Sequence, residues 1–428
     1  MAAVPGCGAA EASAKPVELQ GHGGPVNSLS VSPDGQHLLS GSLDYSVMLW
    51  DIAAQTPPAP QRFIAHKGAV AVVQYFPRSP LALSAGDDGR LYLWDLQRKV
   101  LQHSAAGHKG KTVALAIAED ERLAISGGWD GQMLVWDLPE LSIRQRFNLP
   151  GHTLNAVLLS ADQLKLYSAG NDGNIRVWDR ETGDSRVLYQ HGWPILTMSW
   201  LPGQQQLAFG AVNGSAAVLD LQQEAISKVL IPHEKPVQAL AVSATHGLLA
   251  TGGNDGAIRV WKIADWSLQG ETRNIPGPVW ALAFAGDGGA LYYGSLDDAI
   301  KRWPLAFEED IVFPEQNTRR FQVTQGQNLG EVLFARKCSV CHTLQGNDAN
   351  RAGPSLYQVF GRRAGSLPGY PYSAGLRASP LVWNEETIDQ LFADGPDQVT
   401  PGSKMPLQKM PRTAHRKALI DYLKQATQ

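Results

Sequence analysis

Three residues near the end of the sequence have the types and spacing needed for chemistry. The stretch RKCSVCHTL, residues 336–344, places Cys338 and Cys341 in a C-x-x-C pattern, with His342 directly after them. Thiols at this spacing bind metals, form redox-active disulfides or bond covalently to a haem, whose iron the neighbouring imidazole then binds. The whole chain has only three cysteines, so this cluster is the main candidate site.

Haem attachment explains the cluster better than the two other chemistries do. A zinc site needs further ligands at suitable spacing, and the sequence has no second C-x-x-C. A redox pair of the thioredoxin type needs a βαβ setting, which this part of the sequence lacks. One helical turn separates Cys338 from His342, so the thiols and the imidazole can face the same side of a macrocycle. We therefore predict one covalently attached haem c.

Motifs on both sides of the cluster resemble a known family. From about residue 325 the sequence is similar to the class I cytochromes c of mitochondria and alphaproteobacteria, and the similarity continues nearly to the end. The resemblance implies an all-α cytochrome c domain over 325–428, after a linker over 306–324. The matching segments are GEVLFARKCSVCHT, GPSLYQVFGRRAGSLPGYPYSAGLR, VWNEETIDQLF, PGSKMP and HRKALIDYLKQAT.

The resemblance implies roles for the residues that hold the haem. Cys338 and Cys341 would bond the porphyrin, and His342 would be the proximal iron ligand. The Pro354 carbonyl would orient the His342 ring, fix its tautomer and raise its basicity. Met405, within PGSKM, is expected as the second axial ligand, because a thioether favours ferrous iron and raises the reduction potential.

Other positions match the family less securely. Met410 also stands near a proline and is the rival of Met405, although it lies outside the PGSKM pattern. Leu391 stands where the family often has a tyrosine beside the methionine sulfur, and Tyr422 is expected to pack near Phe334. Four residues resemble the partners of the haem propionates in this family: Arg362, Tyr370, Tyr372 and Trp383. For the three aromatic ones, core packing is the alternative.

The expected ligation favours an electron carrier over an enzyme. Two filled axial positions leave no open site on the iron, so the haem passes single electrons to and from redox partner proteins. The alternative is a haem-c-fed periplasmic oxidoreductase with a second cofactor or substrate site on the rest of the chain. The haem-d nitrite reductases join a cytochrome c to a propeller in this way, but they place the cytochrome first and use eight blades.

A Trp-Asp pair or its equivalent recurs through the first three hundred residues. The steps between its members are 44, 42, 42, 41, 42 and 42 residues. The members are Trp50-Asp51, Trp94-Asp95, Trp136-Asp137, Trp178-Asp179, Leu219-Asp220, Trp261-Lys262 and Trp303-Pro304. Histidines open six of the units, namely His22, His66, His108, His152, His191 and His233. The pattern resembles the WD40 repeat family and implies an all-β propeller of seven blades over 15–305.

The resemblance gives the histidines and turn aspartates a structural role. In this family a His, a Ser or Thr, an Asp and a Trp form a buried network, and the matching set in blade three is His108, Ser126, Asp130 and Trp136. Metal binding or catalysis by these side chains is therefore not expected.

Two blades depart from this pattern, and the ring needs a closing strand. Blade five has Phe209 and Leu219 in place of the hydroxyl and the Trp, and blade seven has Ile275 in place of the His. Apolar packing should hold both blades. The segment PVELQ, residues 16–20, precedes the first repeat and can complete blade seven, which would leave no open edge in the ring.

Charge is distributed unevenly between the two halves. The net charge is −3, but residues from 318 onward carry 14 Lys+Arg against 8 Asp+Glu, a net of +6, which leaves −9 before them. The overall balance does not favour nucleic acid, and no apolar run is long enough for a membrane span. Lys337, Lys404 and Lys409 lie near the haem motifs, where a basic rim would attract acidic partners.

Three of the tryptophans that are not part of a Trp-Asp position are candidates for a binding surface. Trp129 directly precedes the turn Asp of blade three, Trp193 follows the opening segment of blade five, and Trp280 opens the first strand of blade seven. In WD40 proteins these places tend to lie on the narrow face. Exposed aromatic side chains often anchor interfaces. They are therefore candidates for binding a redox partner or the protein's own cytochrome domain, with packing under loops as the alternative.

The expected location follows from the haem. Haem c is attached outside the cytosol, so we expect a periplasmic protein. Residues 1–14 have no basic segment or apolar core, but Ala-x-Ala patterns in them resemble the end of a secretory signal, with a disordered tail as the alternative. Cys7 could be removed, free or lipidated. The expected signal peptide would then be missing or truncated in this sequence.

Overall fold

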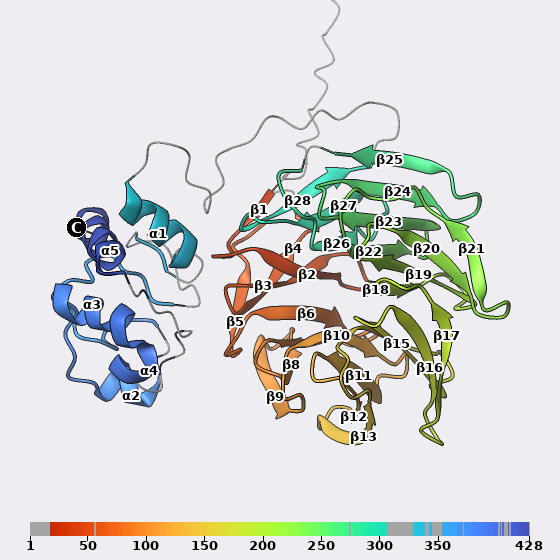
Figure 1. Cartoon of the computed structure of the whole chain (residues 1–428), viewed down its shortest axis with the longest axis horizontal. Coiled ribbons are helices and arrows are strands. Elements are labelled where there is room, and N and C mark those ends of the chain that lie inside the picture. Colours follow the sequence, from red (N-terminus) through yellow and green to blue (C-terminus); the bar gives the residue numbers. More distant parts are fainter. Residues whose placement is uncertain are drawn as a thin grey trace, which may run out of the picture.

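The computed structural model describes two regions of different architecture. The described residues are 18–54, 57–273, 275–305, 328–338, 342–344, 353–370, 372–400, 403, 405, 410 and 412–427. Those up to residue 305 form strands, and those from 328 onward form helices (Figure 1). The predicted order, a β-propeller followed by a small helical domain, is confirmed.

The described strands form seven four-stranded antiparallel sheets. Blade one consists of β2 (Val26–Val31), β3 (His37–Ser42), β4 (Ser46–Asp51) and β5 (Gln61–Ile64), and blade two of β6 (Val70–Tyr75), β7 (Leu81–Gly86), β8 (Arg90–Asp95) and β9 (Val100–Ala106). Blade three consists of β10 (Thr112–Ile117), β11 (Leu123–Gly128), β12 (Gln132–Asp137) and β13 (Ser142–Asn148), and blade four of β14 (Leu154–Leu159), β15 (Lys165–Gly170), β16 (Asn174–Asp179) and β17 (Ser185–Gln190).

The remaining blades continue the same order around the ring. Blade five consists of β18 (Ile195–Trp200), β19 (Gln206–Ala211), β20 (Ala216–Asp220) and β21 (Ala225–Val229), and blade six of β22 (Val237–Ser243), β23 (Leu248–Gly253), β24 (Ile258–Lys262) and β25 (Leu268–Thr272). Blade seven consists of β26 (Ala281–Phe284), β27 (Ala290–Gly294), β28 (Ala299–Pro304) and β1 (Glu18–Gln20).

The ring closes through the first strand of the chain. β1 pairs with β28 in the register Glu18↔Lys301 and Gln20↔Ala299, as predicted for the segment 16–20. The first strands of neighbouring blades contact one another in turn, and β2 contacts β26 to complete the circle. Apolar clusters lie between adjacent sheets, so each blade is stabilised by its two neighbours.

Hydrogen-bonded networks join the second and third strands of several blades to the segment that precedes the first strand. In blade three, Trp136 Nε1 donates to Ser126 Oγ (2.9 Å), Ser126 Oγ lies 2.7 Å from His108 Nε2, and His108 Nδ1 lies 2.9 Å from Asp130. Every donor has an acceptor only if His108 is neutral with its proton on Nδ1. Burial agrees with this, because it lowers the pKa of His108 despite the nearby Asp130 carboxylate.

The blades that lack this motif are held differently. Phe209 and Leu219 are fully buried in one apolar cluster of blade five, and Ile275 is buried in a cluster of blade seven with Trp303, as predicted. In blade four, Asp172 pairs with Arg176, four residues further along, while Trp178 Nε1 donates to Ser168 Oγ at 2.8 Å.

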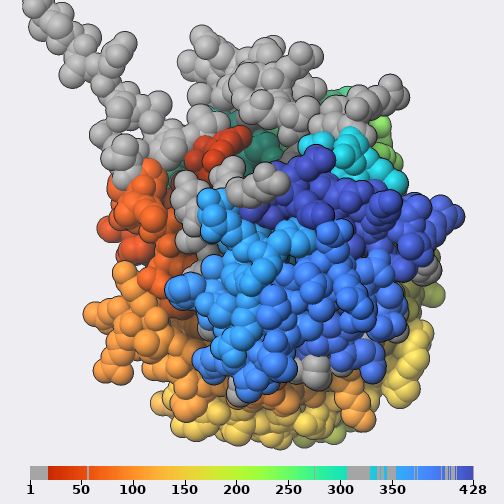
Figure 2. Space-filling view, turned by 90° about the vertical axis from the view of Figure 1, so that its left-hand side faces the viewer, coloured from red at the N-terminus to blue at the C-terminus, as the bar shows by residue number. Residues whose placement is uncertain are grey.

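The C-terminal region contains the described helices. They are α1 (Leu329–Lys337), α2 (Ala374–Ala378), α3 (Glu385–Asp394), α4 (Pro396–Val399) and α5 (Thr413–Ala426). Figure 2 shows residues 353–427 gathered in one compact body. None of the helices in the described part of the chain is long and apolar enough to cross a membrane.

Local sequence signals begin and join these helices. Asn328 caps α1 through its side chain, and Asn384 and Thr387 form a capping box at the start of α3. Helices α1 and α5 cross at Gly330, where a Cβ atom would lie 2.0 Å from the Ala418 carbonyl oxygen. The Phe334 and Tyr422 rings pack at the same crossing with centroids 5.8 Å apart, as expected from the sequence.

Candidate functional site

The end of helix α1 positions the first residue of the cysteine motif. Cys338 is buried in the apolar cluster of the helical domain, and its backbone N–H donates to the Phe334 carbonyl at 2.8 Å. The His342 N–H donates in turn to the Cys338 carbonyl at 2.8 Å. These two i→i−4 bonds place Cys338 and His342 one helical turn apart, as the sequence predicted. Cys341 lies outside the described residues.

A backbone carbonyl orients the imidazole of His342. The Nδ1 atom lies 2.8 Å from the Pro354 carbonyl oxygen. A carbonyl only accepts hydrogen bonds, so Nδ1 carries the proton and Nε2 keeps a lone pair that can bind iron. This is the contact that the family resemblance implied.

The loop that carries Pro354 lies close to the imidazole ring. A Cβ atom at Gly353 would lie 2.4 Å from His342 Cε1, so a larger residue there would displace the ring. The Leu356 N–H donates to the Thr343 carbonyl at 2.8 Å and fixes the other side of the loop. Sequence reasoning missed the roles of Gly353 and Thr343, although the Gly-Pro pair at 353–354 was a possible signal of close backbone approach.

The two methionines have different surroundings. Met410 is buried in the apolar cluster, and its backbone N–H donates to the Phe392 carbonyl at 2.7 Å. Its own carbonyl accepts from Arg416 Nη1 at 2.8 Å, which fixes Met410 as a core residue. Met405 is only partly buried, at the margin of the same cluster. This difference supports Met405 rather than Met410 as the candidate iron ligand.

Arg362 makes contacts that the sequence did not predict. Its guanidinium donates to the carbonyls of Ser355 (2.6 Å) and Tyr357 (2.8 Å), on the loop that follows Pro354. Burial lowers the pKa of Arg362. The described contacts therefore give this side chain a role in positioning the loop.

The other expected propionate partners lie close to Arg362. The Tyr370 and Tyr372 rings have centroids 4.7 Å apart, and burial raises the pKa of Tyr372. Trp383 is partly buried against the apolar cluster, and its backbone N–H donates to the Arg362 carbonyl at 3.0 Å. These residues lie near one another, and their contacts with a haem propionate stay a prediction.

The candidate docking residues are described unequally. Trp129 and Trp193 are 51% and 56% exposed, whereas Trp280 is partly buried. Trp129 lies in the β11–β12 turn, and the amine of Lys111 lies 4.9 Å from its ring centroid. The side chain of Lys337 is not described, and Lys404 and Lys409 lie outside the described residues.

The described arrangement fits a haem. It supplies a buried thiol, an imidazole with a carbonyl-bonded Nδ1, a glycine that lets the loop approach the ring, and a partly buried thioether. A haem c bound there would supply an iron that alternates between the ferrous and ferric states. The fold and site together define a small helical electron-transfer domain that follows a β-propeller in the sequence.

Comparisons with known proteins agree with this class. The family model "WD domain, G-beta repeat" matches residues 15–51, 59–95, 99–137, 143–179 and 225–262, and the family model "Cytochrome c" matches residues 327–427. Cytochrome c of Ginkgo biloba is 37% identical over 98 residues, which cover 23% of this chain and 86% of that protein. Cytochrome c of Sesamum indicum is 38% identical over 98 residues, or 23% of this chain and 87% of that protein. The chain therefore belongs to the cytochrome c family through its C-terminal domain, which follows a WD40 propeller.

Proposed function

We propose that this protein carries single electrons on one haem c. Cys338 and Cys341 hold the porphyrin, His342 and Met405 bind the iron, and no enzymatic step occurs on the propeller. The bond between His342 Nδ1 and the Pro354 carbonyl is the main support, because it prepares Nε2 for iron. Membership of the cytochrome c family supports the same electron-carrying role.

The propeller serves in this proposal as a docking platform for a redox partner. The partner binds the narrow face, which is the end formed by the turns between the second and third strands of each blade and by the links between blades. Trp129 and Trp193 lie on this face and expose about half of their surface. Large exposed aromatic side chains are frequent anchors of protein interfaces. The electron-transfer contact can be small, because redox encounters are transient.

The proposed location is the bacterial periplasm. The support is chemical, because haem c is attached outside the cytosol. Export through a leader would also be required, and residues 1–17 lie outside the described residues.

An absorption spectrum of the purified holoprotein tests the carrier proposal against the oxidoreductase alternative. The carrier shows haem c bands alone, and these convert fully between the oxidised and reduced spectra on titration with one electron per protein. Additional chromophore bands, or consumption of more than one electron per protein, would contradict the carrier proposal and favour a second cofactor.

A further inference from the structure

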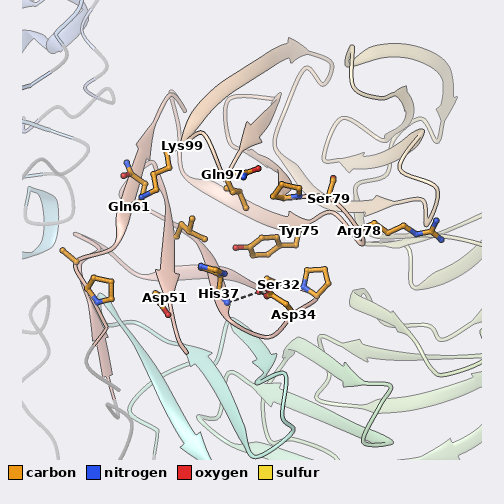
Figure 3. A pocket seen from close by; sticks show the side chains of 16 residues that line it. Ser32, Asp34, His37, Asp51, Gln61, Tyr75, Arg78, Ser79, Gln97 and Lys99 are labelled. Atoms are coloured by element: carbon orange, nitrogen blue, oxygen red, sulfur yellow. Dashed lines mark hydrogen bonds between the residues drawn. The ribbon is translucent and has the colours of Figure 1, made fainter. Parts of the chain in front are cut away.

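A groove lies between blades one and two on the wide face of the propeller. The wide face is the end formed by the loops between the first and second strands and between the third and fourth strands. The groove has a volume of about 650 Å³. Its apolar lining comes from both blades and includes Leu49, Pro58, Pro80 and Leu96, as Figure 3 shows for the whole set of lining side chains.

A tyrosine presents a hydroxyl group to this groove. Figure 3 shows the Tyr75 side chain in the middle of the lining residues, between those of blade one and those of blade two. The residue is 9% exposed, and no described residue hydrogen-bonds its hydroxyl oxygen. A buried phenol needs a partner, so the groove offers a hydrogen bond to whatever occupies it.

The loop beside the groove departs from the repeat. Between β4 and β5 it spans residues 52–60, nine residues, whereas the matching loops of blades two to six have four or five. Compared with blade two, five extra loop residues and a β5 strand that is three residues shorter than β9 account for the 44-residue step between the first two Trp-Asp pairs. Proline occupies positions 57, 58 and 60, and prolines favour a pre-ordered extended segment. Pro58 and Ala59 of this loop line the groove, where the other blades have only a short connection.

The charged residues on the two sides of the groove differ in the hydrogen bonds that they already make. On blade one, Asp34 accepts from the Gln36 N–H (3.0 Å) and Asp51 from the Ala53 N–H (3.0 Å), so both carboxylates stabilise their own loops. On blade two, Arg78 and Lys99 are exposed, and among the described residues neither side chain lies within ion-pair distance of a carboxylate. The charge of Arg78 does act on Asp120 of blade three, and the Arg78 backbone N–H donates to Glu121 Oε1 at 2.6 Å. These two cations lie at opposite ends of the groove in Figure 3. The groove therefore fits an apolar segment with acidic residues at both ends.

The chain leaves the propeller close to this groove. The Leu305 N–H, at the end of blade seven, donates to the Gly289 carbonyl at 3.0 Å, in the loop between β26 and β27. In the same loop Gly286 touches Gly35, whose Cβ position would lie 2.9 Å from Gly286 Cα. Gly35 belongs to the loop whose residues 32–34 line the groove. The path from Leu305 to the groove thus crosses a single loop contact on the wide face.

The segment that begins there has a matching composition. Residues 306–327 separate Leu305 from helix α1 and lie outside the described residues. At about 3.3 Å per residue these 22 residues can span at most roughly 70 Å. Their sequence contains EEDIVFPE at 308–315, four apolar residues with acidic residues on both sides. Residues 1–17 precede strand β1 of blade seven and are the other candidate segment, but they are mostly small and include one acidic residue.

We propose that residues 308–315 of the linker bind in the groove between blades one and two. Ile311, Val312 and Phe313 contact its apolar walls, and the flanking carboxylates pair with Arg78 and Lys99. A backbone carbonyl of the segment accepts from the Tyr75 hydroxyl. The bound linker ties the cytochrome domain to the wide face and leaves the narrow face to an external partner. This proposal does not depend on the iron ligands.

Hydrogen–deuterium exchange of the full-length holoprotein tests the proposal. In the wild type, the amides of residues 308–313 exchange at least tenfold more slowly than expected for an unstructured chain, and Arg78→Glu with Lys99→Glu removes this protection. The matched control is Lys67→Glu with Lys109→Glu, which makes the same charge change at exposed lysines of the narrow face and leaves the protection intact.

A reciprocal variant guards against misfolding of the propeller. Glu308→Lys with Glu315→Lys changes only the linker, and it abolishes protection in the wild-type propeller but restores it in the Arg78→Glu, Lys99→Glu background. The proposal is overturned if residues 308–313 exchange at unprotected rates in the wild type, or if the groove variant leaves their protection unchanged. Protection of the groove-lining amides that arises only after an external protein is added, with residues 308–313 still unprotected, would show that the groove binds a partner instead.

Discussion

The propeller and the cytochrome domain are stabilised in different ways. In the propeller, hydrogen-bonded networks lie within single blades, and apolar clusters lie between each blade and its neighbour. In the cytochrome domain, Cys338, Met410 and residues of α1, α3 and α5 form one cluster, and Met405 lies at its margin. A repeated fold therefore distributes its stability over many small units, whereas the small helical domain depends on one core that includes the haem site.

Loss of haem attachment should produce the largest difference in stability between the two regions. In a Cys338→Ala, Cys341→Ala variant the cytochrome domain loses its covalent group and a large part of its core, so we expect it to unfold at room temperature while the propeller stays folded. Limited proteolysis followed by mass spectrometry would then yield a resistant fragment that ends near residue 305. A helical domain that resists protease as well as the wild type does would contradict the comparison.

Within the propeller, the blade without the usual network should be sensitive to loss of apolar volume. Phe209 of blade five is fully buried where the first four blades and blade six have a Ser or Thr, so Phe209→Ala should cost about 3–5 kcal/mol in the free energy of unfolding. Ser126→Ala leaves His108 and Trp136 without their shared partner and should cost about 1–3 kcal/mol. Denaturant unfolding of both variants measures the difference, and a smaller cost for Phe209→Ala would refute the role given to apolar packing.

Acid should weaken the propeller in two steps. Burial lowers the pKa of His66, His108 and His233 below the ordinary 6.5, so protons bind the unfolded chain more strongly and the free energy of unfolding falls as the pH drops below about 6.5. Burial alone would raise the pKa of Asp88, but His66 holds it at about 2, so further stability is lost between pH 3.8 and 2. Thermal unfolding from pH 8 to pH 2 measures both losses of stability, and His66→Gln should reduce the slope of the first one.

The smallest effects are expected at the partner surface. Trp129→Ala and Trp193→Ala should each weaken the affinity for the redox partner about tenfold, because aromatic anchors carry much of the energy of small interfaces. Val229→Ala is a suitable control, since this side chain is 67% exposed on the outer strand β21. Unchanged affinity in both Trp variants would exclude the narrow face as the binding site of the partner.

Electron transfer to an acidic partner should also slow as salt rises, because screening weakens the attraction of a basic rim.

The repeat made most of the fold predictable. The regular steps between Trp-Asp pairs gave the number of blades, and the position of residues 16–20 before the first repeat gave the closing strand. The contact between His342 and Pro354 was also expected, because the cytochrome c resemblance implies it.

Features that depend on neighbouring elements were harder to predict. Asp172 matches the turn aspartates of the other blades, yet it forms an ion pair with Arg176, four residues further along the chain. The commitment of Arg362 to two loop carbonyls depends on how residues 353–362 fold back. The wide-face groove needs two blades side by side and a longer loop in only one of them, so no single repeat contains its signal.

The iron ligands test the central claim most directly. A haem bound by His342 and Met405 shows the weak ferric charge-transfer band in the far red that marks a methionine ligand. This band should disappear in Met405→Ala and persist in Met410→Ala, in which only a buried core residue is lost. Both spectra should be recorded on holoprotein with intact covalent haem. Loss of the band in Met410→Ala and its survival in Met405→Ala would contradict the assignment, and with it the account of how this domain carries an electron.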